Sequence, residues 1–187
     1  MAIKLKHSNK YPTYFITFTC TQWMPLFEIT NSYDLVYNWF AFIKKKYKAD
    51  VVAYVIMPNH LHAILHFHNE NFDLSNIISN GKRFMAYEII NRLQAAGNNE
   101  MLDRLSSLLS EREKKKGQLH KVFKDSFDAK PIITQHFLLH KINYIHNNPI
   151  NGKWQLAKDF VGNEHSSASF YEIQLVRHFK PLHYLEL

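Results

Sequence analysis

The sequence is poor in cysteine and glycine, because its 187 residues include one cysteine, Cys20, and five glycines. A single cysteine excludes an internal disulfide framework and a zinc site built from several cysteines. Neither a G-x-G-x-x-G nor a G-x-x-x-x-G-K-[ST] pattern occurs. The two common glycine-rich phosphate-binding loops are therefore absent, and we expect no nucleotide cofactor.

Long apolar runs are also missing from the sequence. No stretch approaches the ~18 uninterrupted apolar residues that a membrane-spanning helix requires. Residues 1–12 lack the apolar region of a signal peptide. We therefore expect no membrane partner and take a cytoplasmic location as the default.

The residues that are present indicate a basic globular protein. Hydrophobic residues make up 46% of the chain, which is enough for a sizeable core, and the length suits one domain over residues 1–187. The formal charge of +7 and the pI of about 9.4 fit a polyanionic partner, of which nucleic acid is the commonest. Residues 94–118 are polar and charge-rich, and we interpret them as an insertion or a flexible segment of this domain.

Periodicity along the chain predicts an α+β fold. Residues 11–20 alternate as in an antiparallel strand, whereas residues 31–48 and 74–93 show helical spacing. Residues 79–83 suggest a break in the second helix or the start of another helix, and residues 120–127 read as another strand. With the hairpin described below, the order β–α–β–β–α–β predicts a ferredoxin-like (RRM-like) antiparallel sheet with helices packed on it. The predicted core residues of the two helices are Leu35, Trp39, Phe42, Ile43, Ile77, Ile78, Phe84, Met85, Ile89 and Ile90.

Residues 51–68 predict a β-hairpin, in which two apolar runs are joined by a turn at residues 57–59. Side chains alternate along a strand, so His60 and His62 project from one face while Leu61 points the other way. Two neighbouring imidazoles on a rigid strand are suited to hold a divalent metal. The alternative interpretation is a structural pair or an exposed strand face.

His66 and His68 share the face of His60 and His62. With a rise of ~3.3 Å per residue, His68 lies beyond the reach of a metal that the first two histidines hold. We therefore exclude His66 and His68 from the predicted site.

Residues 131–150 predict a helix that begins after an N-cap at Thr134 and stops at Pro149. Tyr144 and Asn148 are four residues apart, so they can face the same cavity. Asn148 directly precedes proline, which leaves open whether it is a helical residue or a C-terminal cap. The apolar ridge of this helix comprises Leu138, Ile142 and Ile145.

A metal on His60 and His62 needs further ligands, and the amide oxygen of Asn148 is an acceptable hard donor for Mg²⁺ or Mn²⁺. The hydroxyl of Tyr144, one helical turn away, is then placed to attack a group bound to that metal. The alternative is a tyrosine that only packs the helix and an asparagine that only ends it.

Two segments resemble the motifs of one enzyme family. MPNHLHAILHF resembles the His-hydrophobic-His (HUH) motif of the single-tyrosine HUH transposases, and YIHNNPI resembles the catalytic-helix signature of their REP-associated branch, in the IS200-like superfamily. YFITFTCTQWMPLFE, VFKDSFDAKPI and WQLAKDFVGNEHSSASFYE resemble further segments, so the likeness covers most of the chain apart from residues 94–118 and the last dozen. Ile150 replaces the usual valine, and residues 151–154 replace a common Arg-Ala-Gly-Leu run.

The resemblance implies an active DNA transposase in which Tyr144 is the nucleophile and His60, His62 and Asn148 hold Mg²⁺ or Mn²⁺. It implies sequence-specific binding of hairpin-forming single-stranded DNA, with cleavage and strand transfer through a covalent 5′-phosphotyrosine. It also implies a homodimer and a bacterial, nucleoid-associated protein. The basic side chains that we expect to contact DNA phosphates are Lys44, Lys45, Lys46, Lys48, Lys82, Arg83 and Lys153.

Three other functions remain open at this stage. A zinc hydrolase would use His60 and His62 with a metal-bound water, would require another His, Asp or Glu at the site, and would make Tyr144 dispensable. A domesticated DNA-binding protein would bind DNA without cutting it. A replication initiator or relaxase would share the HUH chemistry, although such proteins usually carry added domains.

Overall fold

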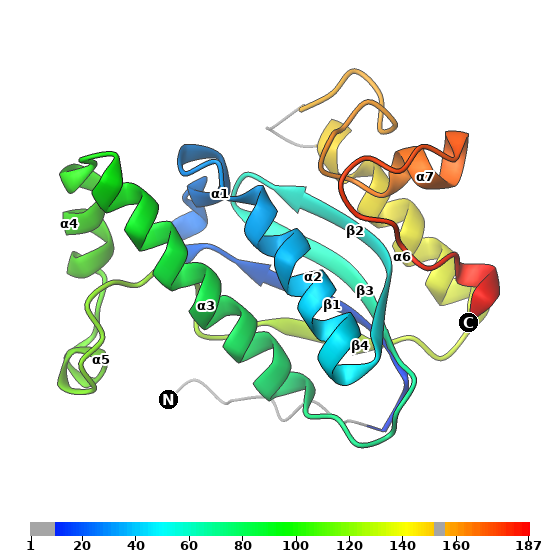
Figure 1. Ribbon diagram of the computed structural model, residues 1–187, viewed down its shortest axis with the longest axis horizontal. Helices are drawn as coiled ribbons and strands as arrows, with labels where there is room; N and C mark the ends of the chain where they lie inside the picture. The colour runs from blue at the N-terminus through cyan, green and yellow to red at the C-terminus, as the bar shows by residue number, and fades with distance from the viewer. Residues whose placement is uncertain (1–9, 152–155) are drawn as a thin grey trace.

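The computed structural model describes residues 10–151 and 156–187, and strands and helices follow one another along this part of the chain (Figure 1). The strands are β1 (Thr13–Thr19), β2 (Ala49–Met57), β3 (His60–Phe67) and β4 (Asp128–Pro131). The helices are α1 (Leu26–Ile29), α2 (Tyr33–Tyr47), α3 (Leu74–Ala95), α4 (Asn99–Ser107), α5 (Glu111–Lys115), α6 (Gln135–Asn147) and α7 (Ala168–Ile173). Short 3-10 turns lie at η1 (Thr21–Trp23), η2 (Asn148–Ile150) and η3 (Tyr184–Glu186).

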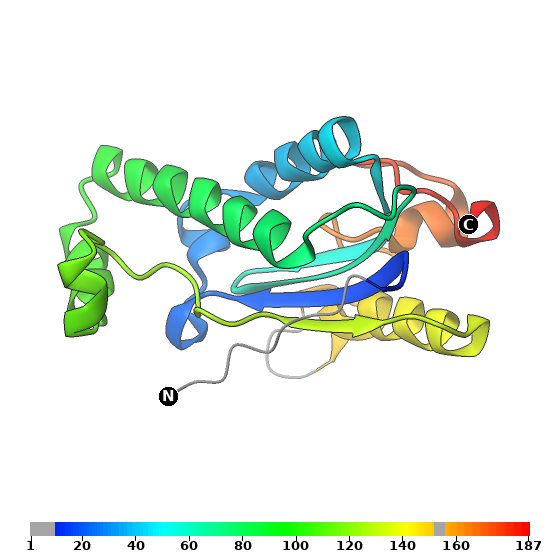
Figure 2. The same cartoon turned by 90° about the horizontal axis from the view of Figure 1, so that it is seen from below.

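The four strands form one antiparallel sheet in the order β2-β3-β1-β4. Helix α2 connects β1 to β2, and α3 follows the β2–β3 hairpin, which is the connectivity of the ferredoxin-like fold. Figure 2 shows α2 and α3 on one side of the sheet and α6 on the other. The predicted α+β architecture, with an antiparallel sheet and helices packed on it, is confirmed.

Alternation along the strands divides the core into two clusters. Tyr14, Ile16 and Phe18 of β1 belong to the larger cluster, which includes side chains of α2 and α3. Phe15 points to the opposite face and joins a smaller cluster with Ile145 of α6. Burial of large apolar side chains on both faces, at about 25 cal/mol per Å² of apolar surface, fixes the sheet between its two helical layers. The face with the smaller cluster also carries the paired histidines.

Helix α2 buries a stripe formed by Val36, Trp39, Phe40 and Ile43. These positions follow the i, i+3, i+4, i+7 spacing of one helix face. The prediction that Phe42 belongs to the core was wrong, because its side chain is 47% exposed. Phe42 lies outside the stripe and packs instead on its own helix, beside Tyr47.

Helix α3 runs without a break through residues 79–83, so the predicted interruption was wrong. Gly81 sits inside the helix because α2 crosses it there, and a Cβ atom at Gly81 would meet Nε1 of Trp39 at 2.5 Å. The sequence feature that resembled a helix break is therefore a close packing contact. Phe84, another predicted core residue, is 60% exposed, whereas Met85 and Ile89 are buried as predicted.

The substitution Gly81→Ala is expected to destabilise the protein, although Gly-to-Ala in a helix interior is ordinarily stabilising by roughly 0.5–1 kcal/mol. The new methyl group would force Trp39 out of its packed position, and overpacking of this kind costs about 1–3 kcal/mol. Urea unfolding measures the difference. Ser79→Ala, on the exposed side of the same helix, is the control and should leave stability unchanged or slightly higher. A more stable Gly81→Ala variant would contradict the packing argument.

The fourth strand is β4 at residues 128–131, and the prediction of a strand over residues 120–127 was wrong. Val122 and Phe123 are buried, but they lie in a connecting segment whose strand pairing is an isolated bridge between Phe123 and Cys20. Their side chains pack into the larger core cluster. These residues are apolar because the loop that contains them is buried. Sequence periodicity does not distinguish a buried loop from a short buried strand.

Residues 94–118 contain α4 and α5, which extend away from the end of α3 (Figure 1). Leu105 is fully buried and anchors α4 to the larger core cluster. Ser110 and Glu113 form a capping box at the start of α5. The segment that we interpret as an insertion is thus helical and attached to the core.

Among the helices of the described ranges, none combines the length and apolar character that a bilayer crossing needs.

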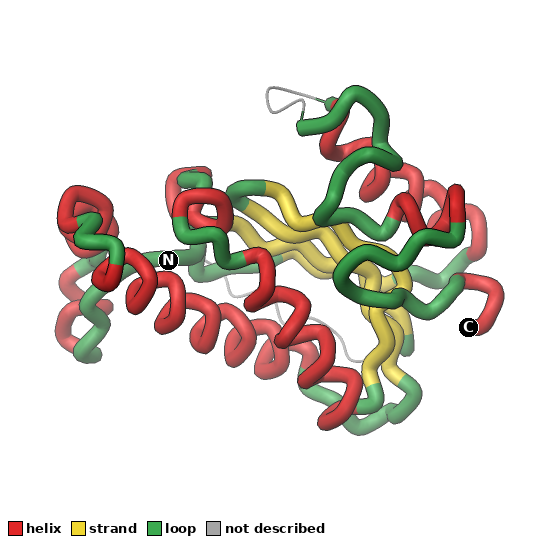
Figure 3. The backbone as a smooth tube through the Cα atoms, turned by 45° about the horizontal axis from the view of Figure 1, so that its top comes forward, coloured by secondary structure: helices red, strands yellow, loops and turns green. Residues whose placement is uncertain are grey.

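The C-terminal segment runs beside β2, on the edge of the sheet opposite β4 (Figure 3). The amide of Ile56 donates to the carbonyl of His165 at 2.8 Å, and the amide of Ser167 donates to the carbonyl of Tyr54 at 2.9 Å. These bonds satisfy backbone groups of an edge strand that would otherwise be exposed.

Candidate active site

The site lies where β1, β3 and the end of α6 meet. The predicted hairpin is confirmed, with Pro58 and Asn59 between β2 and β3. The antiparallel register places Thr17 opposite His62 and Thr19 opposite His60. Because β3 begins at the first of the two histidines, both lie at the same end of the sheet.

The two imidazoles are adjacent and each is held by a neighbouring polar side chain. Their ring centroids are 4.7 Å apart. Nδ1 of His60 lies 2.6 Å from Oδ1 of Asn59, and Nδ1 of His62 lies 2.6 Å from Oγ1 of Thr17. Partners of this type fix the orientation of a histidine and leave Nε2 for a metal.

Burial keeps both imidazoles neutral at neutral pH. Desolvation lowers the pKa of His60 to about 4, against a smaller opposing effect of a hydrogen bond with Asn148. Desolvation, with help from the charges of His60 and Lys141, lowers the pKa of His62 to about 3. A metal binds the neutral imidazole, so these shifts favour metal binding over proton binding.

Tyr144 projects from α6 toward this pair. Its hydroxyl lies 3.4 Å from Nε2 of His62, and the residue is 43% exposed, so Tyr144 is both near the histidines and accessible. Phe15 contacts the ring edge-on at 5.9 Å, and Nζ of Lys141 lies 5.0 Å from the ring centroid. These contacts hold an exposed tyrosine at a defined position.

Asn148 is the C-terminal cap of α6 and keeps helical geometry, with φ −58° and ψ −40°. The sequence left open whether Asn148 is a helical residue or a C-terminal cap. Both descriptions apply, because Asn148 caps the helix and has helical backbone angles. Its side chain acts on His60 and raises the pKa of that imidazole, against the larger lowering by burial. The structure thus brings together all four residues predicted to form the catalytic set: Tyr144, His60, His62 and Asn148.

A buried hydrogen bond fixes the end of α6 against the sheet. Nε2 of His146 lies 3.0 Å from Oγ of Ser167, and that oxygen also accepts from the amide of Tyr54 at 2.9 Å. Both His146 and Ser167 are almost fully buried, so no water competes for these groups. His146 lies between Tyr144 and Asn148 in the chain, and the bond therefore sets the position of both.

The predicted donor set has three protein ligands, whereas a structural zinc site has four. Two neutral imidazoles and one amide oxygen are available, and Mg²⁺ or Mn²⁺ accepts such a set together with substrate oxygens. Within residues 10–151 and 156–187, no three His, Cys, Asp or Glu side chains are grouped so that they could hold a metal. The zinc hydrolase interpretation required such a third ligand.

The lysines at the end of α2 lie far from the histidines. Lys44 pairs with Asp50 at 2.7 Å, and Lys45, Lys46 and Lys48 are exposed beside it. They precede Ala49, which pairs with Phe67 at the other end of the ladder from His60. Phosphate contacts by these lysines stay a prediction, and any such contact would be made away from the catalytic set.

Lys82 has a different role from the predicted phosphate contact. Its side chain is buried, and Nζ donates to the carbonyls of Lys124, Asp125 and Ser126 at 2.6, 3.1 and 3.3 Å. All three ammonium protons are used, and burial lowers the pKa of Lys82 to about 8. Lys82 therefore anchors a loop.

Arg83 is exposed on α3, beside the ring of Phe84, on the side of the sheet opposite Tyr144. A phosphate contact by Arg83 stays a prediction. Lys153, the last of the predicted DNA contacts, lies outside the residues that the structure describes.

A groove of about 450 Å³ adjoins His62 and Tyr144. The sequence did not identify the side chains that line it, apart from these two residues. They include Trp23, Lys124, Lys130 and Lys141, drawn from four separate parts of the chain. Lys141 lies three residues before Tyr144 on the same helix, and this spacing is the one local signal for any of them.

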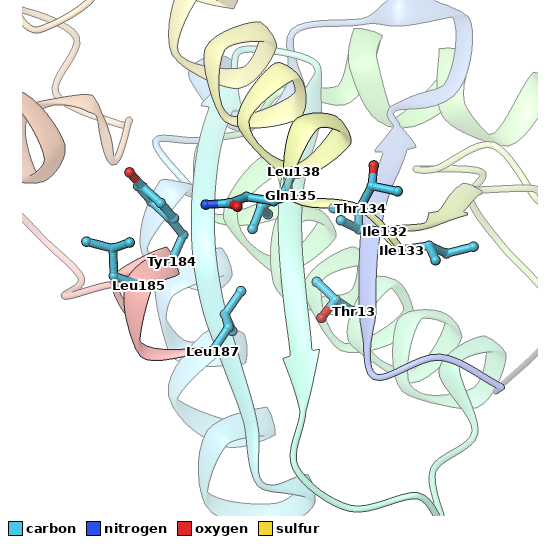
Figure 4. Close-up of a pocket in the computed structure, with 9 residues that line it drawn as sticks. All are labelled: Thr13, Ile132, Ile133, Thr134, Gln135, Leu138, Tyr184, Leu185 and Leu187. Atoms are coloured by element: carbon cyan, nitrogen blue, oxygen red, sulfur yellow. The ribbon is translucent and has the colours of Figure 1, made fainter.

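A second pocket, of about 360 Å³, lies at the opposite end of α6 (Figure 4). Tyr184, Leu185 and Leu187 of the C-terminal turn line it together with Gln135 and Leu138 of the first turns of α6. None of the predicted site residues lines this pocket, so it is separate from the histidine pair.

The metal-free protein is expected to lose stability as the pH falls from about 6.5 toward 4. Unfolded histidines bind protons at the ordinary pKa of 6.5, whereas the folded pKa is about 4 for His60 and His146 and about 3 for His62. The unfolded state therefore binds more protons in this window, and each histidine lowers the free energy of unfolding by about 1.4 kcal/mol per pH unit.

Urea unfolding at pH 7, 6 and 5 tests this expectation. The carboxyl groups whose pKa is lowered, Asp50 and Glu113, have ordinary values of 3.8 and 4.5 and would reduce stability only at lower pH. A free energy of unfolding that stays constant between pH 7 and 5 would show that the three imidazoles are not buried in the neutral form.

The fold is similar to that of the REP-associated tyrosine transposase bound to a REP hairpin. The TM-score is 0.64 at 17% sequence identity, and the match covers 97% of this chain and 93% of that one. A candidate transposase from Deinococcus radiodurans R1 gives a TM-score of 0.33 at 14% identity, over 79% of this chain and 97% of the other, which is too low to support an argument. No protein-family model matches the chain, and no curated protein sequence matches it. At this identity the likeness shows a shared fold.

Proposed function

We propose that this protein is a metal-dependent DNA transposase of the REP-associated tyrosine type, which cuts and rejoins single-stranded DNA. One observation carries the proposal: the hydroxyl of Tyr144 lies 3.4 Å from Nε2 of His62. Asn148 acts on the pKa of His60 at the same place. The shared fold with a tyrosine transposase supports it.

The proposed reaction is a transesterification at a DNA phosphodiester. Oη of Tyr144 attacks the phosphorus and forms a new P–O bond, while the bond from phosphorus to the 3′ oxygen breaks. The phenolic proton passes to solvent, and the leaving 3′ oxygen takes up a proton. The products are a 5′-phosphotyrosine and a free 3′-hydroxyl, and a 3′-hydroxyl of another strand can reverse the step without ATP.

The chain's own residues orient the reacting groups. His60, His62 and Asn148 would hold Mg²⁺ or Mn²⁺, which when bound neutralises the non-bridging phosphate oxygens. Thr17 and Asn59 orient the two imidazoles. Lys141, whose Nζ is 5.0 Å from the centroid of the Tyr144 ring, places positive charge beside the aromatic ring of the nucleophile, where it would favour the negative charge that develops.

We further propose that the substrate is hairpin-forming single-stranded DNA and that the protein acts as a homodimer on nucleoid DNA. The basic charge of the chain and the REP hairpin bound to the structurally similar transposase support the choice of ligand. A domesticated protein that binds DNA without cutting it is the alternative, and a replication initiator or relaxase would use the same chemistry. The adduct assay separates the domesticated protein from the proposed enzyme.

The test is incubation of the full chain with a labelled single-stranded hairpin DNA and Mg²⁺ or Mn²⁺, followed by a denaturing gel. We expect a covalent protein–DNA adduct and a free 3′-hydroxyl fragment, both of which disappear when EDTA is present. Addition of a second DNA with a free 3′-hydroxyl should yield a joined product. Tight binding without any adduct would favour the domesticated protein.

A further inference from the structure

Trp23 is a large aromatic side chain at the surface beside the histidine pair. It is 51% exposed, although its ring centroid is only 5.7 Å from that of His60, which it meets nearly edge-on. An exposed tryptophan next to a candidate metal ligand gains little from hydrophobic burial. Its position therefore requires another explanation.

The backbone at Trp23 is held in an unfavourable conformation. Trp23 has φ +58°, and the preceding Gln22 has φ +49°. Two consecutive non-glycine residues in the left-handed region cost on the order of 1–3 kcal/mol each, and such residues cluster at functional sites. Nδ2 of Asn59 donates to the carbonyl of Trp23 at 3.0 Å, and the same side chain orients His60. Asn59 thus couples the placement of the exposed ring to that of the imidazole.

The groove beside Trp23 carries positive charge. It lies on the part of the sheet face that α6 leaves open, and Lys124, Lys130 and Lys141 line it. Nζ of Lys124 is 4.3 Å from the centroid of the Trp23 ring. None of these three lysines forms an ion pair with a carboxylate within the described ranges, and Asp128 is the one acidic residue that lines the groove there.

Two of these lysines, Lys130 and Lys141, repel each other. The pKa of Lys141 is lowered by burial and by the charge of Lys130. A phosphate group between them would relieve this repulsion and provide the missing counter-charge. An aromatic platform beside a lysine-lined groove is the arrangement with which proteins bind unpaired nucleic acid.

We infer that Trp23 is a stacking platform for one unpaired base of the DNA, and that Lys124, Lys130 and Lys141 contact the phosphates of that strand. The inference rests on the proposed function, because it takes DNA as the ligand. A base inside a duplex has both faces covered by its neighbours and cannot stack on Trp23, so the groove selects a single strand. The platform thus requires an unpaired nucleotide next to the phosphate that Tyr144 attacks.

Fluorescence anisotropy with a labelled 12-nucleotide oligothymidylate, in EDTA and without cleavage, measures this binding. Trp23→Ala is expected to weaken binding by about 5- to 150-fold, which is the effect of losing one base stack. Trp23→Phe should keep most of the affinity. Phe84→Ala removes another aromatic side chain, 60% exposed on the other side of the sheet, and should bind like the wild type.

Salt titrations test the lysines in the same assay. Lys130→Ala should reduce the slope of log affinity against log salt by about 0.7, as expected for one phosphate contact to a single strand. Lys180→Ala, an exposed lysine of the C-terminal segment, should leave the slope unchanged. A duplex of the same length should bind the wild type more weakly, and Trp23→Ala should not change that binding.

Two results would overturn the inference: wild-type protein that binds single strand and duplex equally, or Trp23→Ala protein that binds the single strand as tightly as the wild type. These results are independent of the proposed chemistry. Protein that binds the oligonucleotide through Trp23 but never forms a covalent adduct would refute the transposase proposal alone. Protein that forms the adduct while Trp23→Ala leaves binding unchanged would refute the platform alone.

Discussion

Replacement of Tyr144 by phenylalanine is expected to abolish the covalent protein–DNA adduct, with a loss of strand cleavage of at least about 1000-fold. The substitution removes the attacking oxygen and nothing else. The edge-on contact of the ring with Phe15 and the nearby ammonium of Lys141 remain. Binding of hairpin DNA should therefore change little, and so should the melting temperature. The adduct is measured on a denaturing gel and binding by anisotropy.

Tyr87→Phe is the matched control for this prediction. Tyr87 is also exposed, at 62%, but it lies on α3 on the other side of the sheet. Its variant should form the adduct at the wild-type rate. Cleavage that survives Tyr144→Phe would refute tyrosine chemistry and would point to an attacking water instead.

Replacement of His62 by alanine is expected to weaken the binding of Mn²⁺ by at least about 100-fold, since loss of a ligand exceeds the 10- to 100-fold effect of losing a supporting residue. Cleavage should fall in parallel and recover only in part at high Mn²⁺. Calorimetry measures the affinity, and the adduct assay measures the activity. Thr17→Val should give a smaller loss, because it removes only the oxygen that lies 2.6 Å from Nδ1 of His62.

His66 provides a close control for His62. Both histidines belong to β3, face the same side, and hydrogen bond through Nδ1 to a threonine of β1, at 2.9 Å from Thr13 in the case of His66. His66→Ala should bind Mn²⁺ as the wild type does. Equal losses in His62→Ala and His66→Ala would show that the metal is not bound by the predicted pair.

The pH dependence of Mn²⁺ binding follows from the same buried pair. Protons compete with the metal for the imidazole nitrogens. The pKa values are about 4 for His60 and about 3 for His62, so this competition becomes strong only near these low pH values. The affinity should therefore change little between pH 7 and 5.5 for as long as the protein stays folded.

Local patterns in the sequence determined several parts of this structure. Alternation over the hairpin placed His60 and His62 on one face, and helical spacing placed Tyr144 and Asn148 on one side of α6. Thr134 was predicted as the N-cap, and its side chain accepts the amide of Phe137. These features depend on neighbours within four residues, for which the geometry of a strand or a helix is sufficient.

Packing between distant segments determines the features for which the predictions from the sequence were wrong. Gly81 resembled a helix break and instead admits Trp39 of α2, and Lys82 resembled a phosphate contact and instead binds the carbonyls of a loop. The apolar residues near Phe123 resembled a strand and instead fill the core. Each of these residues takes its role from a partner far away in the sequence, which periodicity does not reveal.

The sequence by itself therefore determined which side chains share a strand face or a helix face. Only the tertiary structure decided that these two faces meet, through the β1–β3 register that brings Thr17 to His62 and the buried bond from His146 to Ser167 that fixes α6. It also decided that Trp23 and the groove lysines surround the meeting point. The physical reason is that local backbone geometry orders neighbouring residues, whereas burial and hydrogen bonding over long separations choose which ordered faces come into contact.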